Sequence, residues 1–136
     1  MSVLNVYKKI YECGIVVQDH KINGVKGLAI KYGDKCGIFI NNNEIKNSDE
    51  EFLVLVHEWG HCATETLHGL CADSSYIGKC EYRADRRAVL EFLPFDLILY
   101  AAKNGCREVY EFSEFLNLPE EFIAIAFNHY RDIGKL

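Results

Sequence analysis

The feature of this sequence that most restricts its fold is the run HEWGH at residues 57–61, inside a segment whose pattern predicts a helix. On a helix, residues four positions apart project from one face, offset by about 40°. His57 and His61 would therefore present two imidazoles side by side, with Glu58 next to them. An H-E-x-x-H run on a helix is typical of a zinc site in which the histidines bind the metal and the glutamate is a general base.

The segment around this run carries independent helix signals. The run SDEE at residues 48–51 is typical of a capping box, in which the serine hydroxyl and the second glutamate satisfy backbone donors at a helix start. Residues 52–56 are apolar on every side, as expected for a helix buried in a core. Gly69 offers a left-handed C-cap. We therefore predict a buried helix over residues 48–68.

A zinc site of this kind needs a third protein ligand and keeps a fourth position for water. The best candidate is Glu81, because the chain after His61 is long enough to end one helix, cross a loop over residues 69–79 and return on a second helix. Asp85 lies one turn beyond Glu81, where it could accept a hydrogen bond from a ligand imidazole and fix its orientation. The alternatives are two core histidines with a buried glutamate, which is costly without a partner, and a solvated acidic helix face.

These residues predict metal-assisted hydrolysis of a peptide bond. Metal-bound water has its pKa lowered toward neutrality. Glu58 would take its proton and pass it to the departing amine. Two further residues are candidates for a contact with the transition state: His68, near the helix end, and Tyr76, in the expected loop between the ligands. Packing is the alternative for both, and His68 is too far along the helix axis to share the metal.

The run at 57–61, together with EYRADRRAVLEFLP at residues 81–94, resembles the ImmA/IrrE family of metallo-endopeptidases. Members of that family usually show an HELGH helix and then a segment close to E-x-E-A-N/D-x-F-A-x-x-L-L-x-P. The E-x-x-x-D part is also similar to the gluzincin zinc-peptidase pattern, which supports Glu81 as a ligand and Asp85 as its partner. The resemblance is specific over residues 48–94 and loose over the rest of the chain.

Two residues depart from the family pattern. Arg83 stands where the family often has Glu, and Arg87 where it often has Phe. If the family's ligand were the second glutamate, Arg83 would abolish the site, so this replacement favours Glu81 or else a degenerate enzyme. The resemblance implies an α+β, zincin-like minimal metallopeptidase with one Zn²⁺, or another divalent metal, per chain.

The same resemblance implies a protein substrate, namely a helix-turn-helix transcriptional repressor of a prophage or mobile element. The alternative belongs to another class of protein: a metal-stabilised, non-catalytic module that binds a repressor or antitoxin. Glu58 favours the enzyme, because a structural metal site needs no base beside it and usually closes with four protein ligands.

Composition limits the partners and the location. No apolar run reaches membrane-spanning length, and the amino terminus lacks the apolar segment of a signal peptide, so we expect a cytoplasmic protein. The six cysteines form no C-x-x-C pair, and in a reducing compartment we expect free thiols. Cys62 and Cys80 adjoin the proposed ligands and are alternative metal ligands. The net charge of −5 argues against direct contact with nucleic acid and suits a basic protein partner.

The amino-terminal part predicts a helix and a small antiparallel sheet packed on the buried helix. A helix over residues 3–13 would have one apolar face, made of Leu4, Tyr7, Ile10 and Tyr11. A short strand is expected at 15–17, and residues 27–32 and 36–41 predict a hairpin with a three-residue loop. An edge of such a sheet could accept an extended peptide, or the sheet could simply cover the helix. The hairpin register pairs Tyr32 with Cys36, Ile30 with Ile38 and Leu28 with Ile40.

A length of 136 residues fits one domain with a single core. We expect an amino-terminal helix and sheet over residues 1–46, zinc-binding helices over 47–94 and a helical subdomain over 95–136. The stretch 110–129 has the spacing of a helix-turn-helix, but residues 106–136 hold six acidic residues against three basic ones. Because phosphate contacts need cations, we expect packing or substrate docking there. The helices of this subdomain are expected at 95–103, 107–116 and 119–131.

Overall fold

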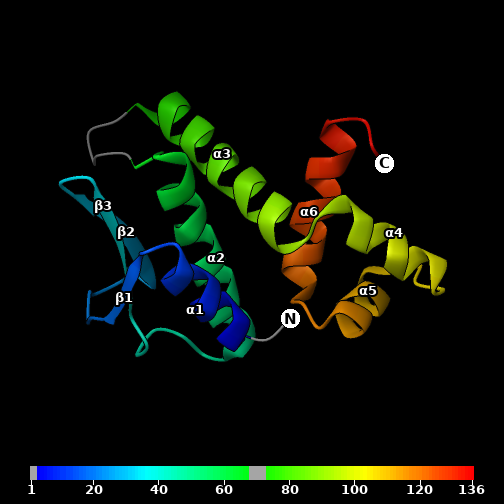
Figure 1. The fold of residues 1–136 in the computed structure, drawn as a ribbon, viewed down its shortest axis with the longest axis horizontal. Coiled ribbons are helices and arrows are strands. Elements are labelled where there is room, and N and C mark those ends of the chain that lie inside the picture. The colour runs from blue at the N-terminus through cyan, green and yellow to red at the C-terminus, as the bar shows by residue number, and fades with distance from the viewer. Residues whose placement is uncertain (1–2, 68–72) are drawn as a thin grey trace.

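In this computed structural model, the described residues, 3–67 and 73–136, form six helices and a three-stranded sheet, which confirms the predicted α+β class. Figure 1 shows the sheet at one end, the long helices α2 and α3 in the middle, and α4, α5 and α6 at the other end. The elements are α1 (Val3–Glu12), β1 (Val16–Asp19), β2 (Gly27–Tyr32), β3 (Lys35–Ile40), α2 (Ser48–Thr64), α3 (Ser74–Phe92), α4 (Phe95–Lys103), α5 (Val109–Leu116) and α6 (Glu120–Asp132).

The sheet is mixed, so the prediction of an antiparallel sheet is wrong. The strand order is β1-β3-β2, with β1 parallel to β3 and β2 antiparallel to it. The connection between β1 and β2 carries the chain past β3, so that β1 pairs with β3 instead of β2. The Asn41 amide holds this connection by donating hydrogen bonds to the carbonyls of Ile22 and Val25, at 2.8 and 3.1 Å. As a result, β2 is an edge strand.

The hairpin between β2 and β3 turns through two residues, and the predicted three-residue loop is wrong. Gly33 has a φ of +65°, a left-handed conformation that a two-residue hairpin loop requires and that glycine adopts without strain. The shift of one residue exchanges the two faces of β2. Leu28 and Tyr32 are therefore exposed, whereas Ala29 is buried. The pairs are Tyr32 with Lys35, Lys31 with Cys36, Ile30 with Gly37, Ala29 with Ile38, Leu28 with Phe39, and Gly27 with Ile40.

Helix α1 buries a narrower face than its apolar spacing predicts. Val6 and Ile10 are fully buried, whereas Leu4 and Tyr11 are 75% and 81% exposed, so their predicted place in the apolar face is wrong. Tyr7 is half-buried, and its hydroxyl donates a hydrogen bond of 2.6 Å to Glu51. This polar contact with α2 orients α1 so that only one stripe faces the core.

Helix α2 includes residues 57–61, but both of its ends differ from the prediction. The N-cap is Asn47, whose side-chain oxygen accepts a 2.9 Å hydrogen bond from the Glu50 N–H, so the predicted capping box at Ser48 is wrong. The helix ends at Thr64 because Glu65 adopts the left-handed conformation, with φ at 55°. The predicted cap at Gly69, like His68, lies outside the described residues.

Helix α3 begins at Ser74, before the point that the sequence predicts. The Asp73 side chain caps it by accepting a 2.8 Å hydrogen bond from the Ser75 N–H. Tyr76 is therefore in the first turn of this helix, and its predicted place in a loop is wrong. Gly60 allows close approach of the α3 backbone, because a Cβ at this position would clash with the carbonyl oxygen of Ala84.

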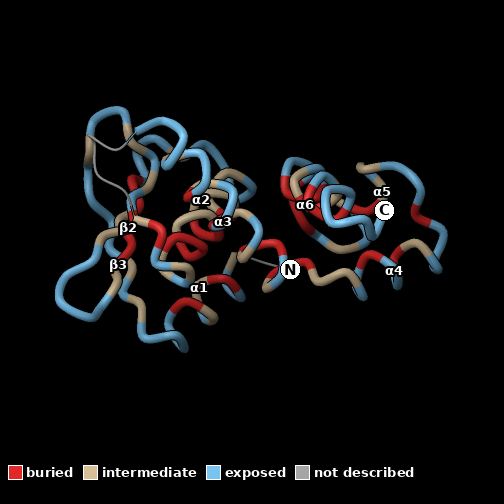
Figure 2. Tube along the Cα trace, turned by 90° about the horizontal axis from the view of Figure 1, so that it is seen from above, coloured by how far each residue is buried: buried red, intermediate tan, exposed pale blue. Residues whose placement is uncertain are grey.

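One hydrophobic core extends from the sheet to the carboxyl-terminal helices. Phe52 of α2 has edge-on ring contacts with Phe92 of α3 and Phe122 of α6, with centroids 6.3 and 5.2 Å apart. The Tyr130 hydroxyl donates a 2.8 Å hydrogen bond to the Leu93 carbonyl, which joins α6 to the end of α3. Figure 2 shows the buried residues in red along the inner sides of these helices. Within the described chain, no helix combines the length and apolar character needed to cross a membrane.

A disulfide joins Cys36 of β3 to Cys62 of α2, so the prediction of free thiols is wrong for this pair. The packing of β3 on α2 brings the two Cα atoms to 5.8 Å, within the range that disulfides adopt. Cys13, Cys80 and Cys106 are free thiols, and Cys71 lies outside the described residues. The bond fastens the sheet to α2 one residue after His61.

Candidate metal centre

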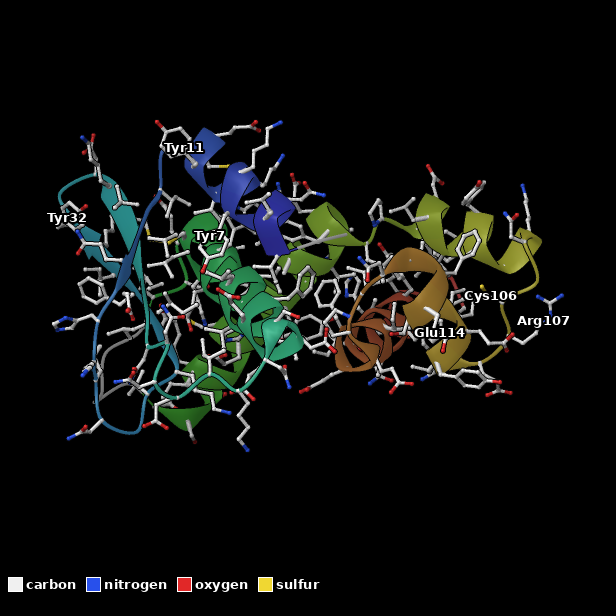
Figure 3. The ribbon with its side chains drawn as sticks, turned by 90° about the horizontal axis from the view of Figure 1, so that it is seen from below. Tyr7, Tyr11, Tyr32, Cys106, Arg107 and Glu114 are labelled. Carbon is white, nitrogen blue, oxygen red and sulfur yellow. A yellow bond between two sulfur atoms is a disulfide. The ribbon has the colours of Figure 1, made fainter. Side chains whose placement is uncertain are left out.

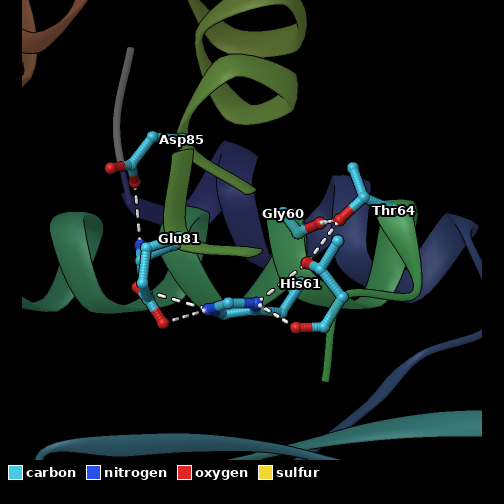
Figure 4. A network of polar contacts seen from close by, with 7 residues as sticks. Gly60, His61, Thr64, Glu81 and Asp85 are labelled. Carbon is cyan, nitrogen blue, oxygen red and sulfur yellow. Dashed lines mark hydrogen bonds and ion pairs between the residues drawn. The ribbon is translucent and has the colours of Figure 1, made fainter. Parts of the chain in front are cut away.

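Two helices bring together three candidate metal ligands. His57 and His61 lie on α2, and Glu81 of α3 contacts both rings. Figure 4 shows Glu81 directed toward His61. The Glu81 carboxylate lies 2.7 Å from Nε2 of His57 and 3.1 Å from Nε2 of His61, and the two Nε2 atoms are 3.2 Å apart. All three ligand atoms lie within 4.8 Å of one another, so this group could hold one metal ion.

The His57 ring is oriented by a carboxylate on the other helix. Its Nδ1 lies 2.8 Å from Oδ1 of Asp85, the contact that the sequence predicts. Burial disfavours the charged form of His57, but this hydrogen bond and the charges of Asp85, Glu58 and Glu81 outweigh it and raise the pKa of His57 to about 9. Donation from Nδ1–H to Asp85 leaves Nε2 directed toward Glu81, as a metal ligand requires.

The His61 ring is held by the chain that follows its own helix. Its Nδ1 lies 3.1 Å from the Thr66 carbonyl oxygen and 3.0 Å from the Thr66 hydroxyl. The Thr64 hydroxyl donates to the Gly60 carbonyl at 2.8 Å and lies 2.7 Å from the Thr66 hydroxyl. Sequence reasoning missed Thr66, because its position depends on the left-handed turn at Glu65, for which the sequence has no glycine or asparagine signal.

Glu58 is partly buried between α2 and the edge strand β2. Its carboxylate accepts a hydrogen bond from the Ala29 backbone N–H. Burial raises the pKa of Glu58, against the lowering effects of His57 and His61 and of this hydrogen bond. A carboxylate with raised proton affinity beside an open cleft is suited to act as a general base.

A cleft of about 1130 Å³ opens beside the metal centre. His57, Glu58 and Asp85 lie in its wall, and its other walls come from the chain before β2, the start of α2, and α5 and α6. It is larger than the usual small-molecule pocket of roughly 300–1,000 Å³. The cleft therefore reaches the candidate base Glu58 and His57, whereas His61 and Glu81 do not line it.

Tyr76 does not line this cleft. It lies in a second cleft of about 650 Å³ with Thr66, Lys79 and Arg83. A hydrogen bond with Cys80 raises the pKa of its hydroxyl. The roles predicted for Tyr76 and for His68, which lies outside the described residues, stay predictions.

The two arginines that depart from the family pattern have different surroundings. Arg83 lines the second cleft, beside the carboxyl-terminal end of α2. Arg87 lies over the Trp59 ring, 5.0 Å from its centroid, and pairs with Glu91 at 3.2 Å. Because this contact covers Trp59, a residue of the H-E-x-x-H run, Arg87 has a packing role at the position where the family often has Phe.

Comparison of the chain with protein-family models, with curated proteins and with solved structures yields no match. Membership of the ImmA/IrrE family therefore stays a prediction from the residues at 57–61 and 81–94.

Proposed function

We propose that this protein is a zinc-dependent endopeptidase in which His57, His61 and Glu81 bind the metal and Glu58 is the general base. The observation that carries the proposal is the convergence of the three ligand atoms within 4.8 Å, beside a cleft that Glu58 lines. Two imidazoles and one carboxylate are a ligand set of catalytic zinc sites, which keep a further position for water or substrate.

The chain's own residues would divide the work as follows. Asp85 and Thr66 fix the two imidazoles by their Nδ1 atoms, so that each Nε2 points toward Glu81, where the metal would bind. A zinc ion, when bound, supplies Lewis-acid activation of water and of a peptide carbonyl. Glu58 takes a proton from the attacking water and delivers it to the leaving amine. The Ala29 N–H orients the Glu58 carboxylate for both transfers.

The resemblance to ImmA/IrrE metallo-endopeptidases supports a zincin-like fold and a helix-turn-helix repressor as the substrate. Repressors of this kind act on DNA in the cytoplasm, which is where we propose that the protein works. Fold-level analogy is a weaker argument than site chemistry, so the substrate is tested directly.

The test is incubation of the zinc-loaded protein with a helix-turn-helix repressor encoded beside its gene, which is where the resemblance to the ImmA/IrrE family implies that the substrate is encoded. We expect repressor fragments, identified by mass spectrometry, with the wild type and none with Glu58→Gln, while zinc content measured by elemental analysis stays equal. Glu12→Gln, at an exposed position on α1, is the matched control and should cleave like the wild type.

Three outcomes separate the alternatives. Cleavage by Glu58→Gln would end the assignment of the general base. A stable, uncut complex of repressor and zinc-loaded wild type would support the non-catalytic binding module. Loss of zinc from Glu58→Gln would mean that the variant cannot test the base, and Glu58→Asp would then replace it, with slower cleavage expected because the carboxylate is withdrawn.

A further inference from the structure

The cleft beside the metal centre concentrates the negative charge of the whole chain. Seven of the twenty acidic residues line it, but only one of the fifteen lysines and arginines does. The lining thus has a formal charge of −6, and the rest of the chain, with fourteen basic and thirteen acidic residues, has +1. The acidic residues in the lining are Asp49, Glu50, Glu58, Asp85, Glu114, Glu120 and Glu121.

At the metal centre His57 is paired with Asp85, but little within the described chain neutralises the carboxylates in the rest of the cleft. The one lysine of the lining, Lys26, is already paired with Glu50, at 3.1 Å. No ion pair joins Glu114, Glu120 or Glu121 to a cation among the residues that the structure describes, and all three are exposed. These carboxylates are therefore available to a ligand.

Helix stability explains only some of the acidic residues that line the cleft. Acidic residues in the first turns of α2 and α6 favour those helices through the helix dipole. Glu114 lies in the second half of α5 and Asp85 lies in the middle of α3, where the dipole gives no such benefit. Figure 3 shows Glu114 on α5, and the cleft separates α5 and α6 from the start of α2.

The spacing of the carboxylates argues for a ligand longer than an ion. Among the described residues, the only group that could hold a metal ion is the one formed by His57, His61 and Glu81. The other carboxylates are spread over four helices, and the apolar residues Val25, Leu53, Val54 and Ile125 also line the cleft. Such a surface fits a segment with both cationic and apolar side chains, and it repels nucleic acid.

We infer that this cleft accepts a lysine- and arginine-rich segment of a protein, with apolar residues between the charges, and excludes acidic segments. The description of this segment as a substrate rests on the proposed endopeptidase function. Glu114, Glu120 and Glu121 act as specificity determinants at the rim, and the apolar residues contact the intervening side chains.

The test measures binding, so that it does not depend on cleavage. Three fluorescent peptides share their length and apolar positions and carry lysine and arginine, serine and glutamine, or glutamate at the remaining positions. Zinc-loaded Glu58→Gln is titrated against each and followed by fluorescence anisotropy at low ionic strength. We expect the basic peptide to bind at least about tenfold more tightly than the neutral one, with less preference at high salt, and no binding of the acidic peptide.

A charge variant then locates the preference. Glu114→Gln, Glu120→Gln and Glu121→Gln, combined in the same background, should weaken binding of the basic peptide about tenfold, because they remove three exposed carboxylates that would pair with its cations. The matched control, Glu12→Gln with Asp34→Asn and Glu44→Gln, removes three exposed charges outside the cleft and should leave the affinity unchanged. Circular dichroism checks that the helix content of each variant is intact.

Equal binding of the basic and acidic peptides, no binding of any peptide, or an unchanged affinity in the rim variant would each overturn this inference. A different result would overturn the proposed endopeptidase function. If the wild type binds the basic peptide with the expected charge preference but cleaves neither it nor the repressor, the endopeptidase is wrong and the selective cleft stands.

Discussion

The two imidazoles of the metal centre are held in different ways. His57 is partly exposed and is oriented by Asp85, a carboxylate from a different helix. His61 is buried and is oriented by Thr66, which lies just beyond the end of the same helix. The first ring thus depends on the packing of α2 against α3, and the second on a local reversal of the chain. The comparison shows that one site combines a long-range contact and a short-range one.

The largest effect on zinc affinity is expected from Glu81, because its carboxylate contacts both imidazoles. Glu81→Ala should lower zinc affinity on the order of 1,000-fold, since four-ligand zinc sites gain about 10–16 kcal/mol in total. Competition with a chelator of known affinity measures the change. Glu81→Gln should lose less, because the amide oxygen can still coordinate. Unchanged affinity in Glu81→Ala would remove Glu81 from the ligand set.

The disulfide between Cys36 and Cys62 is expected to stabilise the folded protein next to His61. Replacing both Cys36 and Cys62 by serine should lower the free energy of unfolding by about 3 kcal/mol, because the bond closes a loop between residues 26 positions apart. Urea unfolding without reductant measures this loss. Under strong reductant the wild type should have the same free energy of unfolding as the variant. If reductant left the stability of the wild type unchanged, the disulfide would not contribute to it.

On the His57 side, Asp85→Asn should reduce zinc affinity by about 10- to 100-fold, the usual cost of losing such an orienting carboxylate. The pH dependence adds a second signature. With its pKa at about 9, His57 is protonated at pH 7, so zinc must displace a proton and its affinity rises with pH until about 9.

Calorimetry in buffers of different ionisation enthalpy measures this proton release. We expect it to be smaller at pH 7 in Asp85→Asn, because the amide no longer favours the charged ring. Equal proton release in both proteins would mean that Asp85 does not set the protonation state of His57.

The smallest effect is expected for Thr66→Val. The substitution removes the hydroxyl but keeps the backbone carbonyl that also faces His61, so zinc affinity should fall only a few-fold, about 1 kcal/mol for one hydrogen bond. The same chelator competition measures it. A loss as large as that of Asp85→Asn would show that the two sides of the centre depend equally on their side chains.

The sequence predicted the contacts that follow from helical periodicity. His57 and His61 share a face because they are four residues apart, and Glu81 and Asp85 do so for the same reason, so a single packing of two helices unites all four. The α+β class followed from similar patterns. Which helices meet, and at what distance, does not follow from periodicity: it depends on the close approach of the α3 backbone to Gly60.

The details that the sequence did not predict depend on single backbone torsions. The positive φ of Gly33 sets the hairpin register, and that of Glu65 ends α2 and places Thr66 beside His61. A positive φ at one residue leaves the apolar pattern of the whole segment unchanged, so the periodicity of the sequence does not reveal it. The Cys36–Cys62 bond was missed for another reason: free thiols were expected from a reducing compartment, and no sequence pattern shows that β3 packs on α2 with these two cysteines side by side.

The near-contact between Gly60 and Ala84 has a consequence for how this architecture tolerates change. The spacing of the two ligand-bearing helices is limited by main-chain atoms meeting where one residue has only a hydrogen. Apolar side chains elsewhere in the core can therefore be replaced by larger or smaller ones without moving His57 and His61 relative to Glu81. A methyl group at position 60 would act in the opposite way, separating the helices while leaving every ligand in the sequence.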